Sequence, residues 1–589
     1  MTLPLEAFAL IGDCETAALV SREGSIAWLC LPRFDSPACC AALLGSRDNG
    51  HWSITPDAAL LRSEQRYRAN TLIAETDLHT AEGAIRVTDF MPIRATHPVL
   101  IRRVSGLAGD VPTTMTAALR FDYGSMPPWV TGSGGTAVMY VGPDKVVLRS
   151  RSRLEIGGGS VSAAFVVRKG SQHDFVMSYG AAHEADPPAV DADDALAATE
   201  RWWREWIGRF DIPVAYPGAL RRSLLTLMAL IHRPTGGLVA AATTSLPEKS
   251  GASLNWDYRY CWLRDSTFTI DALLDCGYED EAIAWRDWTL RAVAGAPEKM
   301  QIMYRVDGSR RVDPAELPWL AGYRFSKPVR IGNAAAAQMQ LDIYGEVIDM
   351  LHACERAGLE RTAQGVHIER AIAAHVERSW VEPDQGLWES RGQSRHYVYS
   401  KVMTWVALHR FLLGKGADEL ADDTRPRLEA LRDHIHEVVC REGFDTGLGS
   451  FTGYFGGQEV DASLLLLPKV GFLPASDERM AGTIARIEQD LVSGGLVHRH
   501  PVSKAHPQGT FLACSFWLAE CQLGQGRRAD AVATIERVLG VQSEPRLLSE
   551  EYDLASRRLN GNFPQALSHL ALIHAVLALA KFDAAGRAA

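Results

Sequence analysis

The spacing of apolar and turn-forming residues changes once along the chain, near residue 190, and this change limits the possible folds more than any other feature. Before it, glycine, proline, aspartate and asparagine interrupt the sequence about every 8–12 residues, with short β-rich runs at 137–141, 146–148 and 161–167. This pattern predicts the hairpins of an antiparallel β-sandwich. From Asp191 onward the spacing is helical, with little β-type alternation. We therefore expect a β domain followed by a large helical domain.

The first helical stretch carries three tryptophans, Trp202, Trp203 and Trp206, on or near one helix face. We interpret them as packing of a linker helix and not as a platform for a ligand. A chain of 589 residues also exceeds the size of one hydrophobic core, so that two domains are expected on length alone.

Composition excludes several classes of function. The formal net charge of −10 argues against a nucleic-acid-binding surface. No uninterrupted apolar run is long enough to span a bilayer, and the start of the chain, MTLPLEAFAL, lacks the pattern of a secretion signal. The ten cysteines show no CxxC spacing, which favours reduced thiols in a cytoplasmic protein. Since neither HExxH nor GxxxxGK[ST] occurs, we expect no metal and no nucleotide cofactor.

The segment Asn255-Trp-Asp-Tyr-Arg-Tyr-Cys-Trp-Leu-Arg-Asp265 places aromatic rings beside paired charges directly before a helical pattern. Aromatic rings stack on sugar faces, and carboxylate and guanidinium groups bind fixed hydroxyls through charge-assisted hydrogen bonds. A buried Arg-Asp pair that only locks two helices together is the structural alternative.

Two distant segments, Gly386-Leu-Trp-Glu-Ser-Arg391 and Ser549-Glu-Glu-Tyr-Asp553, each place a carboxylate beside an aromatic residue before a helical stretch. Glycoside hydrolysis needs such a pair, one acid to protonate the leaving oxygen and one base to activate water. An aromatic neighbour can also raise the pKa of the acid by excluding water. For a single Glu, a solvated loop position or a helix N-terminal charge is the plainer explanation.

With these segments the chain resembles glycoside hydrolase family 15, the glucoamylase and bacterial trehalase-like family, over nearly its whole length. The matching words are NWDYRYCWLRD, VRIGNAAAAQMQLDIYGEV, GLWESRGQSRHYVYSKVMTWVAL, VDASLLLLPKVGFLP, FLACSFWL, SEEYD and GNFPQALSHLAL, and residues 10–45 resemble the trehalase-like subgroup. The resemblance implies an N-terminal antiparallel β-sandwich at 1–190, a linker helix at 191–212 and an (α/α)6 barrel at 213–585.

The resemblance also implies residue roles. Glu389 corresponds to the general acid and Glu550 to the general base, although the adjacent Glu551 leaves that register open. The remaining matches concern substrate binding: Arg264 and Asp265 would fix hydroxyls of the innermost glucose, Trp262 would pack at the pocket base, and Trp388 and Arg499 would bind sugar.

The reaction implied is inverting, exo-acting hydrolysis of an α-glucoside with release of β-glucose. Neither catalytic step inherently needs a cofactor, and activation by phosphate or a divalent ion is left open. We expect α,α-trehalose as the substrate, with glucoamylase or isomaltose-type activity on small α-gluco-oligosaccharides as the alternative. A non-catalytic carbohydrate-sensing protein would be expected to lack one catalytic Glu, and a phosphorolytic enzyme the base. The chain departs from its subgroup at 504–510, KAHPQGT, where an acidic segment is common, so the preferred second sugar is left open. The oligomeric state, including a homo-oligomer, is also left open.

Overall fold

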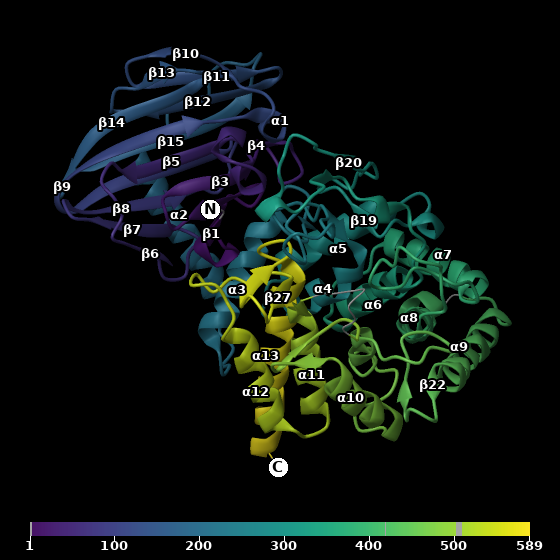
Figure 1. Ribbon diagram of the computed structural model, residues 1–589. Helices are drawn as coiled ribbons and strands as arrows, with labels where there is room; N and C mark the ends of the chain where they lie inside the picture. Colours follow the sequence, from purple (N-terminus) through teal and green to yellow (C-terminus); the bar gives the residue numbers. More distant parts are fainter. Residues whose placement is uncertain (1–2, 419, 502–508, 589) are drawn as a thin grey trace.

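The computed structural model describes residues 3–418, 420–501 and 509–588. They form an N-terminal β domain, a linking helix and a helical domain, in that order. Figure 1 shows the β domain, in purple and blue, against one side of the helical domain, which runs from teal to yellow. This arrangement confirms the β-then-α organisation predicted from the spacing of the sequence.

The β domain consists of two antiparallel sheets that share one long strand, β9 (Val99–Ala118). The first half of β9 pairs with β8 and β15, and its second half pairs with β5 and β14. The first sheet contains β1 (Phe8–Gly12), β2 (Ala17–Ser21), β3 (Ser25–Cys30), β4 (Ala38–Cys40), β5 (His51–Pro56), β13 (Glu155–Gly157) and β14 (Ser160–Arg168). The second contains β6 (Arg62–Tyr67), β7 (Ala74–Thr80), β8 (Gly83–Phe90), β10 (Trp129–Ser133), β11 (Thr136–Val141), β12 (Asp144–Ser150) and β15 (Gln172–Ala181).

The inner faces of the two sheets form one apolar core. Ile11 and Ile54 of the first sheet pack in the same cluster as Ile85 and Leu148 of the second. Alternate side chains of each strand point into this layer, which is the arrangement of a β-sandwich.

The linking helix α2 (Ala192–Gly208) begins at Asp191, whose carboxylate accepts the backbone N–H groups of the first turn. Its N-terminal half packs on the outer face of the second sheet. Its C-terminal half packs on the helical domain, where Trp203 and Trp206 are buried and the Trp206 indole N–H donates to Glu281 at 2.6 Å. The tryptophans therefore join the two domains, which confirms their interpretation as linker packing.

The helical domain is a double ring of helices. The inner ring closes through α4 (Ser266–Asp275), α6 (Asp342–Arg356), α8 (Val398–Leu413), η9 (Ala462–Leu466), α11 (Leu512–Gly524) and α13 (Ala566–Ala588), each packed on the next. The outer positions are α3 (Pro217–Leu230), α5 (Glu279–Val293), α7 (Ala363–Ser379), α9 (Thr424–Glu442), α10 (Glu478–Asp490) and α12 (Arg528–Leu539). Six inner and six outer elements make an (α/α)6 barrel, with a short 3₁₀ helix in one inner position.

The inner helix α13 is predominantly apolar from Ala566 to Ala580. Among the described residues, its segment Ala566–Gly586 is the one stretch long and apolar enough to cross a membrane, and 72% of its most apolar window is buried inside the protein. An inner helix of a double ring contacts protein around most of its circumference, which accounts for this composition.

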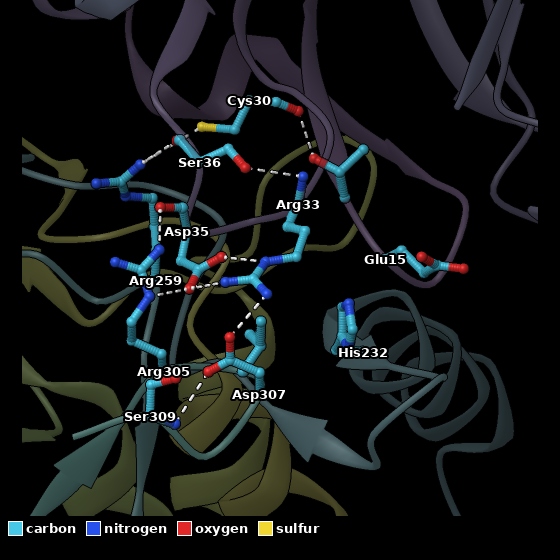
Figure 2. A network of polar contacts seen from close by, with 12 residues as sticks. Glu15, Cys30, Arg33, Asp35, Ser36, His232, Arg259, Arg305, Asp307 and Ser309 are labelled. Carbon is cyan, nitrogen blue, oxygen red and sulfur yellow. Dashed lines mark hydrogen bonds and ion pairs between the residues drawn. The ribbon is translucent and has the colours of Figure 1, made fainter. Parts of the chain in front are cut away.

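An ion-pair network joins the sandwich to the barrel (Figure 2). Arg33, on the loop after β3, pairs with Asp35 at 2.9 Å and with Asp307 of the barrel at 2.8 Å. Arg305 of the barrel pairs in turn with Asp35 at 2.8 Å. The charges alternate across the boundary between the domains, so that the sandwich and the barrel are held in one relative position at this point.

A second link lies deeper, at Arg259, whose side chain is fully buried. Its guanidinium pairs with Asp257 at 2.6 Å and donates to the Ser36 carbonyl at 2.8 Å and the Tyr123 hydroxyl at 2.9 Å. Ser36 and Tyr123 belong to the sandwich, whereas Arg259 belongs to the barrel segment that leads into α4. A residue of the sequence motif 255–265 thus anchors that segment to the other domain.

Candidate active site

A cavity of about 780 Å³ lies where the loops before the inner helices meet. The loops that lead into α4, α8, η9, α11 and α13 all contribute to its wall, so that one end of the barrel forms the site. Its lining includes Glu248, Leu254, Trp256, Tyr258, Arg264, Trp388, Glu389, Arg391, Tyr397, Tyr454, Asp461, Arg499, His500, Phe511, Glu550 and Gln565. Of the residues predicted from the sequence, Arg264, Trp388, Glu389, Arg499 and Glu550 are among them.

Glu389 enters the cavity from the loop before α8, and 17% of its side chain is exposed. Its carboxylate accepts the indole N–H of Trp262 at 2.7 Å and lies 3.5 Å from the Arg264 guanidinium. Burial raises the pKa of the Glu389 carboxyl above its ordinary value, against Arg264 and the Trp262 N–H, which lower it. The backbone of Glu389 has φ +56°, a conformation that residues with a Cβ rarely adopt.

Trp262 and Asp265 lie behind this wall and, in the part of the chain that the structure describes, are not among the lining residues. The Trp262 indole N–H donates to the Glu389 carboxylate, and the Asp265 carboxylate accepts from Arg264 Nε at 3.1 Å. Arg264 also donates to the Leu387 carbonyl at 3.2 Å. The side chain of Asp265 is 6% exposed, and within the described residues it reaches the cavity wall only through its pair with Arg264.

Glu550 enters from the loop before α13 and is 1% exposed. The Tyr258 hydroxyl donates to its carboxylate at 2.5 Å. Burial and the neighbouring Glu248 raise the pKa of Glu550, while Arg499 and the Tyr258 hydrogen bond oppose this shift. Gly561 passes directly beneath it, so close that a Cβ there would lie 2.5 Å from Glu550 Oε2.

The adjacent Glu551 points away from the cavity. It begins strand β27 (Glu551–Asp553), which pairs with β26 (Thr510–Phe511), and successive side chains of a strand face opposite sides. Its carboxylate accepts from Arg499 at 2.9 Å and from the Gly509 backbone N–H at 3.0 Å. Glu550 is therefore the member of the pair that faces the cavity.

Arg499 is a buried cation shared between carboxylates. One of its nitrogens, Nη2, contacts both Glu248 and Glu551. Its guanidinium also lies 5.7 Å from the ring centre of Trp388 and 5.2 Å from that of Phe511. These contacts fix its orientation in the wall.

Trp388 packs between Trp517 and Phe511 at ring-centre distances of 6.1 and 5.3 Å. Its indole N–H donates to Asp461 at 2.8 Å, and Asp461 accepts from His500 at 3.2 Å. Although burial alone would raise the pKa of Asp461, His500 and the hydrogen bonds outweigh it and lower that pKa. The side chain of Trp388 is thereby fixed as an apolar face of the cavity.

Several residues that line the cavity could not be assigned a function from the sequence. Trp256 and Tyr258 lie inside the motif 255–265. The sequence shows these aromatic residues but does not indicate which of their side chains face the cavity. Asp461 and Gln565 likewise lie within the matching words 460–474 and 561–572. Glu248, in the segment Ser245-Leu-Pro-Glu248, follows no helical or strand period and carried no signal.

The segment 504–510, which we expect to affect the choice of the second sugar, lies mostly outside the described residues, since these omit 502–508. Among the described residues, no group of three or more His, Cys, Asp or Glu side chains is arranged to hold a metal ion.

Comparison with known families gives matches to both domains. A family model described as glycosyl hydrolases family 15 matches residues 215–537, and one described as trehalase-like, N-terminal, matches residues 1–203. A trehalase of Mycobacterium tuberculosis is 36% identical over 98% of this chain and 89% of its own length. A trehalase of Thermoplasma acidophilum is 34% identical over 94% and 97%. An isomaltose glucohydrolase of Kribbella flavida is 26% identical over 51% of this chain and 74% of its own length.

Among solved structures, a bacterial glucoamylase complexed with acarbose superposes with a TM-score of 0.72. The match covers 99% of this chain and 94% of that chain at 12% sequence identity. Similarity at this level of identity concerns the fold, and it supports the arrangement of a sandwich followed by an (α/α)6 barrel.

Proposed function

The chain belongs to family 15 of the glycosyl hydrolases and is a glycoside hydrolase, and we propose that it hydrolyses α,α-trehalose with inversion at the cleaved carbon. One observation carries the mechanism: Glu389 and Glu550 enter a single cavity from separate loops, each with its own hydrogen-bond donors. The substrate rests on the full-length similarity to two trehalases, which extends over the sandwich as well as the barrel.

Glu389 is proposed as the general acid. Burial favours its protonated form, which the acid must have before the reaction. Arg264 and the Trp262 N–H then stabilise the carboxylate that remains once the proton has moved to the glycosidic oxygen. The same two groups therefore favour the product side of the proton transfer.

Glu550 is proposed as the general base. Its carboxylate takes a proton from a water molecule while the water oxygen bonds to C1 of the glucose. The C1–O glycosidic bond breaks in the same step. The leaving oxygen keeps the bonding electron pair and takes the proton from Glu389. The hydrogen bond from Tyr258 orients the Glu550 carboxylate for this role.

The stereochemistry of trehalose gives a direct test of the proposal. Inversion converts the cleaved glucose to the β-anomer, whereas the leaving glucose keeps its α configuration. Proton NMR in the first minutes of the reaction should therefore show α- and β-glucose in equal amounts. Release of α-glucose alone would refute inversion.

A panel of trehalose, maltose, isomaltose, kojibiose and nigerose tests the substrate. We expect the highest kcat/KM on trehalose. A preference for isomaltose, the sugar in the name of the Kribbella flavida relative, or for maltose would keep the mechanism and refute the substrate.

The cysteines support a further part of the proposal, that the protein functions in the cytoplasm. Each of the ten is free, and nine are buried. Burial raises the pKa of thiols such as Cys261 well above the ordinary value, which keeps them protonated and unreactive. Fractionation of the native cells tests this, since trehalose hydrolysis by the protein should appear in the cytosolic fraction and not outside the cell.

A further inference from the structure

Glu248 is a third carboxylate in the cavity wall, and neither the acid nor the base role uses it. Its side chain is 5% exposed and reaches the cavity from the segment between α3 and α4. One oxygen accepts the Trp256 indole N–H at 3.2 Å, and the other contacts Arg499 Nη2. Burying a carboxylate costs free energy that a paired cation does not always offset, so its position calls for a function.

Two carboxylates and two guanidinium groups surround Glu550. Glu248 and Glu551 approach from two different segments, Arg499 and Arg264 from two others, and the Tyr258 hydroxyl donates directly. Arg499 is already shared by Glu248 and Glu551. Arg264 is shared by Glu389 and Asp265. Both cations are thus committed to other carboxylates, and neither makes a direct pair with Glu550 within the described residues.

We propose that Glu248 is a positioning residue that increases the basicity of Glu550 by holding a like charge beside it and by drawing Arg499 away from it. The proposal rests on the assignment of Glu550 as the base. Proton abstraction is most efficient when the pKa of the base lies near the working pH, and the ordinary pKa of a glutamate lies below that optimum under neutral conditions. A second carboxylate in a dry wall supplies the required shift.

The sign of the effect follows from the charge. With Glu248 ionised, protonation of Glu550 relieves repulsion, so Glu550 takes up its proton at a higher pH. Glu248→Gln removes the charge but keeps an oxygen that can accept from Trp256. Arg499 is then freer to stabilise the Glu550 carboxylate, and both changes lower the pH at which Glu550 is protonated.

The test isolates the ionisation of the base. α-Glucosyl fluoride needs no protonation of its leaving group, so in a Glu389→Gln background its hydrolysis to β-glucose and fluoride depends on one titrating group, the base. A fluoride electrode follows the reaction. We expect kcat/KM of Glu389→Gln, plotted against pH, to fall at acid pH along one limb, which marks the protonation of the base. Adding Glu248→Gln should move that limb about one pH unit toward acid.

Glu281→Gln provides the matched control, since Glu281 also accepts a tryptophan indole N–H and an arginine but lies on α5, beneath the linking helix. In the same background it should leave the limb in place. Glu248→Asp, which retains the charge, should also keep the limb near its original pH, and Glu248→Ala should move it as Gln does. The Ala variant decides the matter if the Gln variant does not fold.

The outcomes distinguish failure of the base assignment of Glu550 from failure of the role proposed for Glu248. If Glu550→Ala in this background keeps the rate and the limb, Glu550 is not the base and the proposed mechanism fails. If Glu550→Ala abolishes hydrolysis but the Glu248 variants lower the rate equally at every pH, or raise only KM, the mechanism stands. Glu248 would then be a substrate contact or a packing residue, and the inference would be wrong.

Discussion

The hydrogen bond from Trp262 to Glu389 leads to a sharp prediction. In Trp262→Phe the six-membered ring is retained, but the N–H that lies 2.7 Å from the Glu389 carboxylate is lost. This bond strengthens when Glu389 becomes an anion, so it stabilises the transition state more than the bound substrate. We expect the variant to lose kcat on trehalose with little change in KM.

The magnitude follows from the type of bond. A hydrogen bond to a charged group contributes about 1.5–3 kcal/mol, and about 1.4 kcal/mol corresponds to a factor of ten in rate. Arg264, 3.5 Å from the same oxygen, remains in the variant and partly compensates. We therefore expect a loss of about 10- to 100-fold in kcat on trehalose.

The assay compares trehalose with α-glucosyl fluoride, whose leaving group needs no proton. If the N–H acts through the acid, the loss on the fluoride should be less than about threefold. Trp206→Phe is the matched control, because it removes an indole N–H donated to Glu281 at 2.6 Å outside the cavity. Equal losses on both substrates, or an equal loss in the control, would show that Trp262 serves packing alone.

Three further predictions concern the base and the innermost subsite. Glu550→Ala should lower kcat by about 10²–10⁴. Glu551→Ala removes a partner of Arg499 outside the cavity and should lower kcat by less than about tenfold. The reverse order of the two rates would identify Glu551 as the base. Gly561→Ala should lower both kcat and the melting temperature, since a Cβ would lie 2.5 Å from Glu550 Oε2. Gly526 has a similar positive φ but open space around it, so Gly526→Ala should lower only the melting temperature. Asp265→Asn should cut kcat/KM at least about tenfold on trehalose, isomaltose and an aryl α-glucoside alike, and a loss confined to one linkage would mean that Asp265 does not serve a shared glucose.

Much of the fold could be predicted from the sequence because the two domains use different periods. Turn residues at short intervals marked the sandwich, and the helical spacing after Asp191 marked the linking helix and the barrel. The closed double ring could not be read from spacing, since ring closure depends on which helices pack together. That part came from the family resemblance.

The site shows a similar division. Glu389 and Glu550 were visible as carboxylates beside aromatic residues, but the choice between Glu550 and Glu551 depends on the pairing of β27 with β26. The sequence placed Trp262 at the pocket base, whereas the structure places its N–H against Glu389 and its ring outside the cavity lining. Glu248 was missed because it lies in an irregular segment, where no period indicates the direction of a side chain.

The anchoring of Arg259 has a consequence for how this enzyme can be divided or recombined. In the segment 258–262, Tyr258 donates to Glu550 and Trp262 to Glu389, while Arg259 turns the other way and is held by Ser36 and Tyr123 of the sandwich. A barrel expressed alone would leave this guanidinium with Asp257 and without its other acceptors, and the segment that carries Tyr258 and Trp262 would lose its fixed end. We therefore expect a barrel expressed without the sandwich to be inactive, and the smallest active unit of this protein to span both domains.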